Sequence, residues 1–201
     1  MPENGNDRYA LSFTTGGLLA REAATLTPLY LQHHNWEKVR ESALDNNLLQ
    51  VRTYSSGVRH VRETIKRLKF LSQDEIEILG DLTSSELNHM MWAAVCRCYQ
   101  FIGEFAEEVL RERFLILANT VTYEEYDSFY RSKLIWHDEL DEVTSMSYKK
   151  LRQVLFKMMF EAELITPEGS IEPVLISSRV RKHFLDHNPS DIRFFPTKEA
   201  Q

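Results

Sequence analysis

Residues 52–69 decide the predicted fold, and they read Arg-Thr-Tyr-Ser-Ser-Gly-Val-Arg-His-Val-Arg-Glu-Thr-Ile-Lys-Arg-Leu-Lys. The stretch contains six lysines or arginines and a single acid, Glu63. Ser55 and Ser56 are good helix N-caps, because a serine hydroxyl accepts hydrogen bonds from the free N–H groups of a first turn. At about 100° per residue, one helix face gathers the apolar side chains Val58, Val61, Ile65 and Leu68. The neighbouring face gathers the cations Arg59, Arg62, Lys66 and Lys69.

A helix with one apolar and one cationic face can pack on its own domain and still present charge outward. A DNA recognition helix needs this geometry, because it packs against its domain and also enters a groove. Arg52 and Lys69 stand at the two ends, where they could hold the flanking phosphate backbone. The alternative is an ordinary solvated face, since charged outer faces are the norm for surface helices. The pattern alone leaves both interpretations open.

The composition is that of a globular protein with a buried core: 201 residues, 43% hydrophobic and 27% charged. No run reaches the ~18 uncharged apolar residues that cross a bilayer, and the polar, acid-containing N-terminus is unlike a signal peptide. Cys96 and Cys98 lie two residues apart, so on a helix they point to different sides and do not bridge each other. We expect buried thiols and a cytoplasmic, monomeric protein without membrane contact.

A formal net charge of −6 argues against nucleic-acid binding, but the charge is unevenly distributed along the chain. Residues 1–70 carry 10 basic and 7 acidic side chains, a net +3, and residues 148–201 carry 9 and 7, a net +2. Residues 71–118 carry 3 and 9, a net −6, and residues 119–147 carry 2 and 7, a net −5. Local sign decides whether a surface attracts phosphate, so the two outer regions remain candidates. The acidic middle could instead dock a basic protein.

The N-terminal part is predicted to be helical throughout. We expect a helix over residues 18–33 that is kinked or broken at Pro28, and a second over residues 36–45 capped by Asn35. With residues 52–69 these give the order of a helix-turn-helix domain. Capping boxes open two further helices at Ser72 with Glu75 and at Thr83 with Glu86. The second is predicted to run over residues 85–115 as a central, buried helix.

The C-terminal part contains the second cationic helix. A third capping box, Thr122 with Glu125, predicts a helix over residues 123–133. Ser147 is expected to cap a helix over residues 148–163, whose outer arc carries Lys149, Lys150, Gln153 and Lys157. Two β-prone runs joined by Thr-Pro-Glu-Gly follow, which is the layout of a winged helix. We therefore predict two parts, residues 1–118 and 119–201.

Sites for catalysis are weak in this sequence. His137, Asp138, Glu139, Asp141 and Glu142 could supply metal ligands, but an acidic solvated turn explains them better, because metal sites need ligands from several elements. The chain has no Cys-x-x-Cys pair, phosphate loop or dinucleotide glycine pattern. Residues 16–17, two glycines, could cradle an anion before a helix, although a plain turn is the simpler interpretation. We expect no metal and no cofactor.

Several of these segments together resemble the BrxA family. They are Leu-Ser-Phe-Thr-Thr-Gly-Gly-Leu-Leu-Ala-Arg-Glu at residues 11–22, Asn-Leu-Leu-Gln-Val-Arg-Thr at 47–53, Met-Trp-Ala-Ala-Val-Cys-Arg at 91–97, Tyr-Gln-Phe-Ile at 99–102 and Lys-Lys-Leu-Arg-Gln-Val-Leu-Phe at 149–156. BrxA is a small component of BREX, the bacteriophage-exclusion defence systems. The resemblance implies an all-α protein with two helix-turn-helix-like elements, similar in its first part to the RNA-binding factor NusB, that binds DNA without cutting it.

We therefore expect an all-α, non-enzymatic protein that contacts double-stranded DNA through two basic helices and works beside other BREX components. A protein scaffold and a NusB-like RNA-binding factor are the alternatives. The resemblance supplies no catalytic motif, so the DNA-contacting positions come from charge and helical spacing alone. They are Arg52, Arg59, Arg62, Lys66, Lys69, Lys149, Lys150, Gln153 and Lys157.

Overall fold

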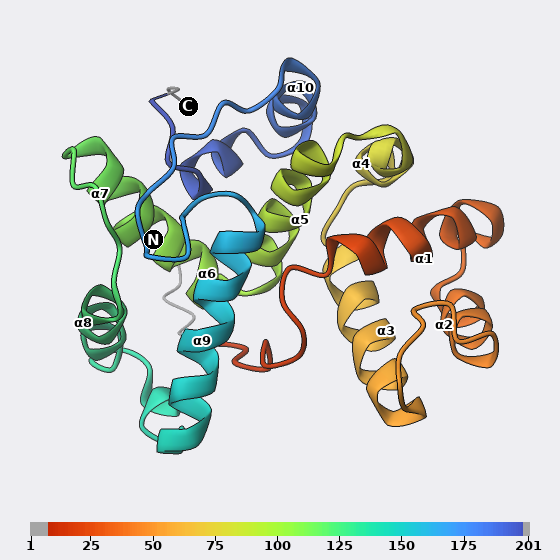
Figure 1. Ribbon diagram of the computed structural model, residues 1–201, viewed down its shortest axis with the longest axis horizontal. Coiled ribbons are helices and arrows are strands. Elements are labelled where there is room, and N and C mark those ends of the chain that lie inside the picture. Colours follow the sequence, from red (N-terminus) through yellow and green to blue (C-terminus); the bar gives the residue numbers. More distant parts are fainter. Residues whose placement is uncertain (1–7, 199–201) are drawn as a thin grey trace, which may run out of the picture.

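Helices provide the regular structure of residues 8–198, the part of the chain that the computed structural model describes. The predicted all-α class is confirmed. The N-terminal elements are α1 (Ala20–His33), α2 (Trp36–Asp45), α3 (Tyr54–Leu68), α4 (Gln73–Ile78) and the 3₁₀ turn η1 (Leu79–Asp81). They pack against one another on one side of the molecule (Figure 1).

The start of the chain follows the predicted helices closely, with two differences. Asn35 caps α2 as predicted, because its Oδ1 accepts hydrogen bonds from Glu37 N at 2.8 Å and Lys38 N at 3.1 Å. Of the two alternatives at Pro28, the break is wrong, because α1 continues through it, and the kink stays a prediction. The predicted serine cap of α3 is also wrong: the helix begins earlier, and Thr53 Oγ1 accepts from Ser56 N. Ser55 and Ser56 consequently lie in the first turn.

The predicted central helix exists, but it is not continuous. It divides into α5 (Ser84–Cys98), α6 (Gln100–Phe105), the π-helical segment η2 (Ala106–Arg111) and α7 (Glu112–Leu115). Tyr99 leaves the helical conformation between the first two (φ −128°, ψ 94°). Its buried hydroxyl donates to Glu63 Oε1 of α3 at 2.5 Å, a tertiary contact that helical periodicity does not contain. The predicted capping boxes of α4 and α5 are both present.

The remaining elements are α8 (Tyr123–Lys133), η3 (Asp138–Leu140), α9 (Ser145–Glu161), α10 (Ser178–His187) and η4 (Pro189–Phe194). The Thr122 capping box opens α8 as predicted. The predicted Ser147 cap of α9 is wrong, because Thr144 Oγ1 accepts from Ser147 N and the helix starts earlier. After Asn188 the chain forms the 3₁₀ helix η4.

The central helices α5 and α6 separate two groups of elements. Helices α1 to α4 lie to one side, α8 and α9 to the other, and α10 with η4 covers the top (Figure 1). Trp92 of α5 is fully buried and donates its indole N–H to the carbonyl oxygen of Phe194 at 2.8 Å. One hydrophobic cluster extends from Tyr9 to Phe195. The two predicted parts thus share a core, and a division at residue 118 stays a prediction.

β-structure among residues 8–198 is limited to two isolated bridges, Thr120 with Ser170 and Ile165 with Ile171. Val121 N donates to the carbonyl oxygen of Gly169 at 2.9 Å. Gly169 has a φ of +85°, and a Cβ at this position would lie 2.5 Å from the carbonyl oxygen of Val121. The turn therefore requires glycine. The segment after α9 therefore returns to pair with the segment before α8. Its description as a wing stays a prediction.

Candidate nucleic-acid interface

The cationic face of α3 is largely open to solvent. Arg52, Arg59, Arg62 and Lys69 are exposed, and among the described residues none of them forms an ion pair. Arg59 donates only a long 3.4 Å hydrogen bond to Ser56 Oγ. Four of the five predicted positions around this helix are therefore free to meet an anion.

Lys66, the fifth position, is partly used by the fold. Its ammonium lies 4.2 Å from the centre of the Tyr99 ring, and it donates to Ser12 Oγ at 3.2 Å. Both contacts hold the side chain against the protein, although part of it stays exposed. A cation–π contact of this kind is worth about 0.5–2 kcal/mol, so a phosphate would have to compete with it.

Arg67 is the one cation of this stretch that is completely buried. It donates to Glu63 Oε1 at 2.9 Å and to the carbonyl oxygens of Gly17 and Leu18 at 2.6 and 3.1 Å. A count of charges along the sequence treats Arg67 as one of the cations that α3 presents to solvent. In the structure, Arg67 instead binds groups inside the protein. The spacing of Glu63 and Arg67 at i and i+4 is a sequence signal for this ion pair, but it does not indicate that the pair is buried.

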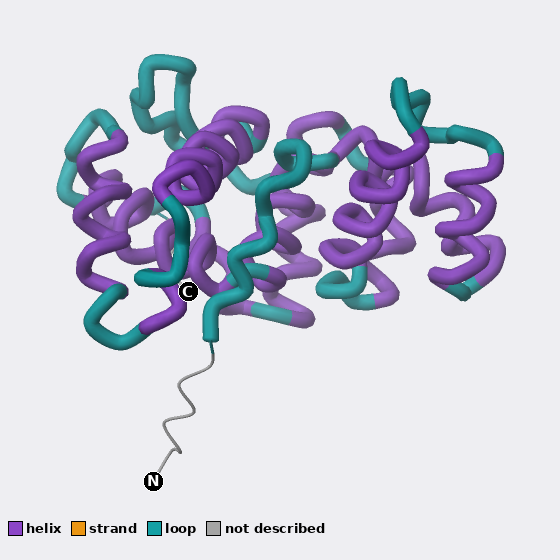
Figure 2. Tube along the Cα trace, turned by 90° about the horizontal axis from the view of Figure 1, so that it is seen from below, coloured by secondary structure: helices purple, strands orange, loops and turns teal. Residues whose placement is uncertain are grey.

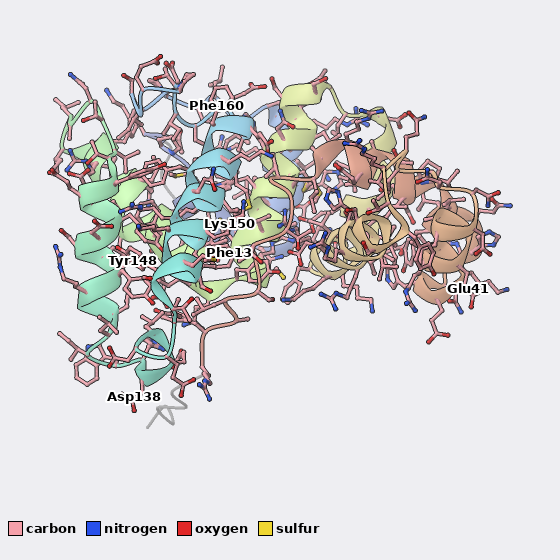
Figure 3. All side chains as sticks on the ribbon, turned by 60° about the horizontal axis from the view of Figure 1, so that its bottom comes forward. Phe13, Glu41, Asp138, Tyr148, Lys150 and Phe160 are labelled. Atoms are coloured by element: carbon pink, nitrogen blue, oxygen red, sulfur yellow. The ribbon has the colours of Figure 1, made fainter. Side chains whose placement is uncertain are left out.

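On α9, the predicted residues Lys149, Lys150 and Gln153 are exposed, and Lys150 donates to Gln153 Oε1 over 3.4 Å. Lys157 is half-exposed and forms an ion pair with Glu161, one turn further on, at 3.5 Å. Figure 3 shows Lys150 and Phe160 along this helix, with the N-terminal loop that carries Phe13 beside it. An exposed ion pair of this type contributes less than about 1 kcal/mol to stability. Lys157 can therefore leave Glu161 for another anion at low cost.

A short loop, residues 16–18, is hydrogen-bonded to both cationic helices. In Figure 1 the red segment that precedes α1 passes between α9 and the group of α1 to α3, and Figure 2 shows the chain that follows the N-terminal end as a loop. The carbonyl oxygens of Gly17 and Leu18 accept from Arg67 of α3, and Leu18 N donates to Glu161 Oε2 of α9 at 2.5 Å. A Cβ on Gly17 would lie 2.1 Å from the same carboxylate oxygen. The anion near these glycines is thus an internal carboxylate, and it fixes one basic helix relative to the other.

The inner side of α9 rests on aromatic rings and one ion pair. Arg152 Nη1 donates to Asp127 Oδ1 of α8 at 2.6 Å, and Tyr148 donates its hydroxyl to the same oxygen. Burial acts to raise the pKa of Asp127, but these hydrogen bonds and the Arg152 charge outweigh it and lower the pKa. Burial and the neighbouring carboxylate raise the pKa of Tyr148 to about 12. Asp127 is therefore ionised at neutral pH and anchors α9 to α8.

The candidate metal ligands do not form a cluster. Within residues 8–198 no group of three or more His, Cys, Asp or Glu side chains could hold a metal ion. Glu139 is buried and accepts from Tyr9 N at 2.5 Å, and the His137 ring stacks on the Tyr9 ring at 3.7 Å. The predicted solvated turn is therefore wrong for His137 and Glu139, which are buried. It is confirmed for Asp138, Asp141 and Glu142, which are exposed. Both cysteines are buried and free, as predicted.

Comparison with known proteins decides the family. A family model described as BrxA matches residues 7–188. The chain belongs to the BrxA family. A curated relative, "BREX protein BrxA" from Bacillus cereus, is 26% identical over 151 residues, which cover 73% of this chain and 74% of the relative. This BrxA-family chain is accordingly a component of BREX phage defence.

The fold of this BrxA-family chain also occurs in a solved structure. The crystal structure of an uncharacterized protein from Magnetospirillum magneticum matches with a TM-score of 0.81 at 18% sequence identity, covering 94% of this chain and 98% of the other. An identity this low shows a shared fold alone. Separately, none of the helices in residues 8–198 has the length and apolarity to span a bilayer.

Proposed function

We propose that this BrxA-family protein binds double-stranded DNA without catalysing its cleavage, and that α3 and α9 carry the contacts. The observation that carries the proposal is the pair of solvent-facing cationic sets, Arg59 with Arg62 on α3 and Lys149 with Lys150 on α9, none of them in an ion pair among the described residues. Unpaired cations are the ones that bind phosphate at the lowest cost, because no carboxylate has to be displaced.

The connection between the helices supports binding to one extended ligand. The loop at residues 16–18 is hydrogen-bonded to Arg67 of α3 and to Glu161 of α9, so the two sets keep a constant separation. A rigid duplex has phosphates at regular spacing, and a protein that presents cations at a constant separation loses less conformational entropy on binding. The turn at residues 166–169 lies beside α9 and would contact the same duplex.

Fluorescence anisotropy with a short labelled duplex across a range of salt concentrations tests the proposal. We expect the logarithm of the binding constant to fall linearly with the logarithm of salt concentration, with a slope of about −0.9 per phosphate contacted. Arg59→Glu with Arg62→Glu, and separately Lys149→Glu with Lys150→Glu, should each weaken binding by about tenfold or more and make the slope shallower.

Lys182→Glu on α10 is the matched control, because it reverses one exposed cation on the side of the molecule opposite the lower ends of α3 and α9 (Figure 1). Its affinity should stay within a small factor of the parent protein. Unchanged affinity in both double variants would show that these helices do not carry the binding. Preference for a structured RNA over the duplex would favour the NusB-like alternative.

A second candidate function, a scaffold for other BREX components, rests on an exposed apolar region. A groove of about 720 Å³ lies between the end of α7 and residues 171–175. Two of the residues that line it are strongly exposed, Leu117 at 74% and Leu175 at 85%, and exposed apolar patches are typical of protein-binding surfaces. Pull-down of other BREX components after nuclease treatment, with Leu175→Asp as the disrupting variant, separates this function from binding bridged by DNA.

A further inference from the structure

A second groove lies directly beside the cationic face of α9. It has a volume of about 410 Å³ and is bounded by α9, the start of α8 and the turn at residues 166–169. Three aromatic side chains line it: Tyr123, Phe156 and Phe160. Tyr123 is 46% exposed and Phe160 is 48% exposed. The groove therefore presents aromatic ring surface to solvent, whereas most aromatic side chains of this chain are buried.

The wall of the groove is held in place before any ligand arrives. The ring of Tyr123 meets the ring of Phe156 edge-on, with centroids 4.8 Å apart and planes at 89°. The guanidinium of Arg152 lies 4.2 Å from the Tyr123 ring centre and is itself bound to Asp127. Because these contacts fix the ring, a flat ligand would meet a preorganised surface and lose less entropy on binding.

The groove is also continuous with the cationic surface of α9. Gln153 and Lys157 belong both to its lining and to the outer arc that carries Lys149 and Lys150. A phosphate bound to those lysines would bring the attached nucleotide to the mouth of the groove. The lining also includes one carboxylate, Glu168, which disfavours phosphate inside but can accept a hydrogen bond from the amino group of a base.

We propose that this groove binds an unpaired nucleobase, stacked on its aromatic side chains, while α9 holds the phosphates of the same strand. This inference rests on the proposed DNA-binding function and adds a preference for distorted or locally single-stranded DNA. Single-stranded nucleic acid is commonly bound by cations along the backbone together with aromatic rings under the bases. The volume suits one small planar group, and a base-paired duplex is too wide to enter it.

The test compares a perfect DNA duplex with the same duplex carrying one extra, unpaired adenine. Anisotropy titrations of the full chain should show the bulged duplex binding about tenfold tighter or more. With 2-aminopurine as the unpaired base, its fluorescence should fall as it stacks on the aromatic rings. Phe160→Leu should abolish both the preference and the fluorescence change while the affinity for the perfect duplex stays the same, since α3 and the lysines of α9 are untouched.

Trp136→Leu is the matched control, because Trp136 is an exposed aromatic residue, 71% accessible, that does not line the groove. It should keep the preference for the bulge. Equal affinity of the parent protein for both duplexes, or a preference that survives Phe160→Leu, would overturn the groove assignment alone. Failure to bind either duplex would overturn the proposed function with it, so the two failures are distinguishable.

Discussion

The two cationic helices differ in what holds them to the rest of the molecule. Helix α3 is buried on two sides: apolar residues such as Val61 pack against its neighbours, and the Glu63–Arg67 pair packs against the loop at residues 16–18 and Tyr99. Helix α9 buries an apolar arc, and the ion pair that joins its Arg152 to Asp127 of α8 remains partly accessible. One helix therefore uses buried charge for support, and the other uses apolar and aromatic packing.

The number of cations on a helix therefore exceeds the number that remain available to an anion. On α3, Arg67 is fully buried and Lys66 is held against Tyr99. On α9, Lys157 pairs with the carboxylate of Glu161, and Lys150 donates only a long hydrogen bond to Gln153. A cation stays available to an anion only where no other part of the chain, including a loop distant in sequence, packs over it.

The largest expected effect comes from breaking the buried support of α3. Arg67→Ala would leave Glu63 buried without its cation, which typically costs about 3–5 kcal/mol. Urea denaturation should show the midpoint falling strongly. The comparison variant is Lys157→Ala on α9, whose exposed pair should contribute less than about 1 kcal/mol. Similar losses for the two variants would contradict the contrast between the helices.

An intermediate effect is expected where the loop at residues 16–18 connects the helices. In Gly17→Ala, the new methyl group would lie 2.1 Å from Glu161 Oε2, so the carboxylate must move away from Leu18 N. We expect a loss of about 1–3 kcal/mol in the free energy of unfolding, together with weaker DNA binding.

Gly80→Ala provides the control for that substitution, because a Cβ there has no atom within 4 Å. It should be neutral or raise stability by up to about 1 kcal/mol, through the lower entropy of the unfolded chain. If Gly17→Ala behaved like Gly80→Ala in thermal unfolding, the close contact between the loop and α9 would not hold in solution.

The smallest effect concerns pH and the anchor of α9. The pKa of Asp127 is lowered in the folded protein, so its ionisation stabilises the fold above the unfolded pKa of about 4. That contribution is lost as the pH falls through the lowered folded pKa. When the pH falls from neutral to about 3, Asp127→Asn should therefore lose less free energy of unfolding than the parent protein. The difference between the two losses should be under about 1 kcal/mol, because the ion pair is partly exposed. Urea midpoints at the two pH values measure the difference, and equal losses would contradict it.

Much of the fold was predictable because it is encoded locally. Asn35, the three capping boxes and the apolar spacing of the helices act over three or four residues, and the structure has each of them where the sequence predicts it. The misplaced caps of α3 and α9 are local errors of a few residues, in which a preceding threonine was the better acceptor. The interruption at Tyr99 was not predicted, since the hydrogen bond that Tyr99 donates to a different helix lies outside any local pattern.

The candidate site divides in the same way. The exposure of Arg59, Arg62, Lys149 and Lys150 agrees with the helical spacing that selected them. The groove beside α9 was missed, since Tyr123 and Phe160 are ordinary apolar positions in the sequence and only the turn at residues 166–169 encloses the space between them.

The sequence by itself determined the all-α class, most helix positions and the two cationic arcs, because backbone capping and side-chain periodicity are set by neighbouring residues. Only the tertiary structure decided which cations stay available and how the two helices are joined. Arg67 reaches Gly17 across 50 positions of sequence, and Leu18 reaches Glu161 across 143. Such contacts form only when the whole core brings the segments together, so no local pattern of residues contains them.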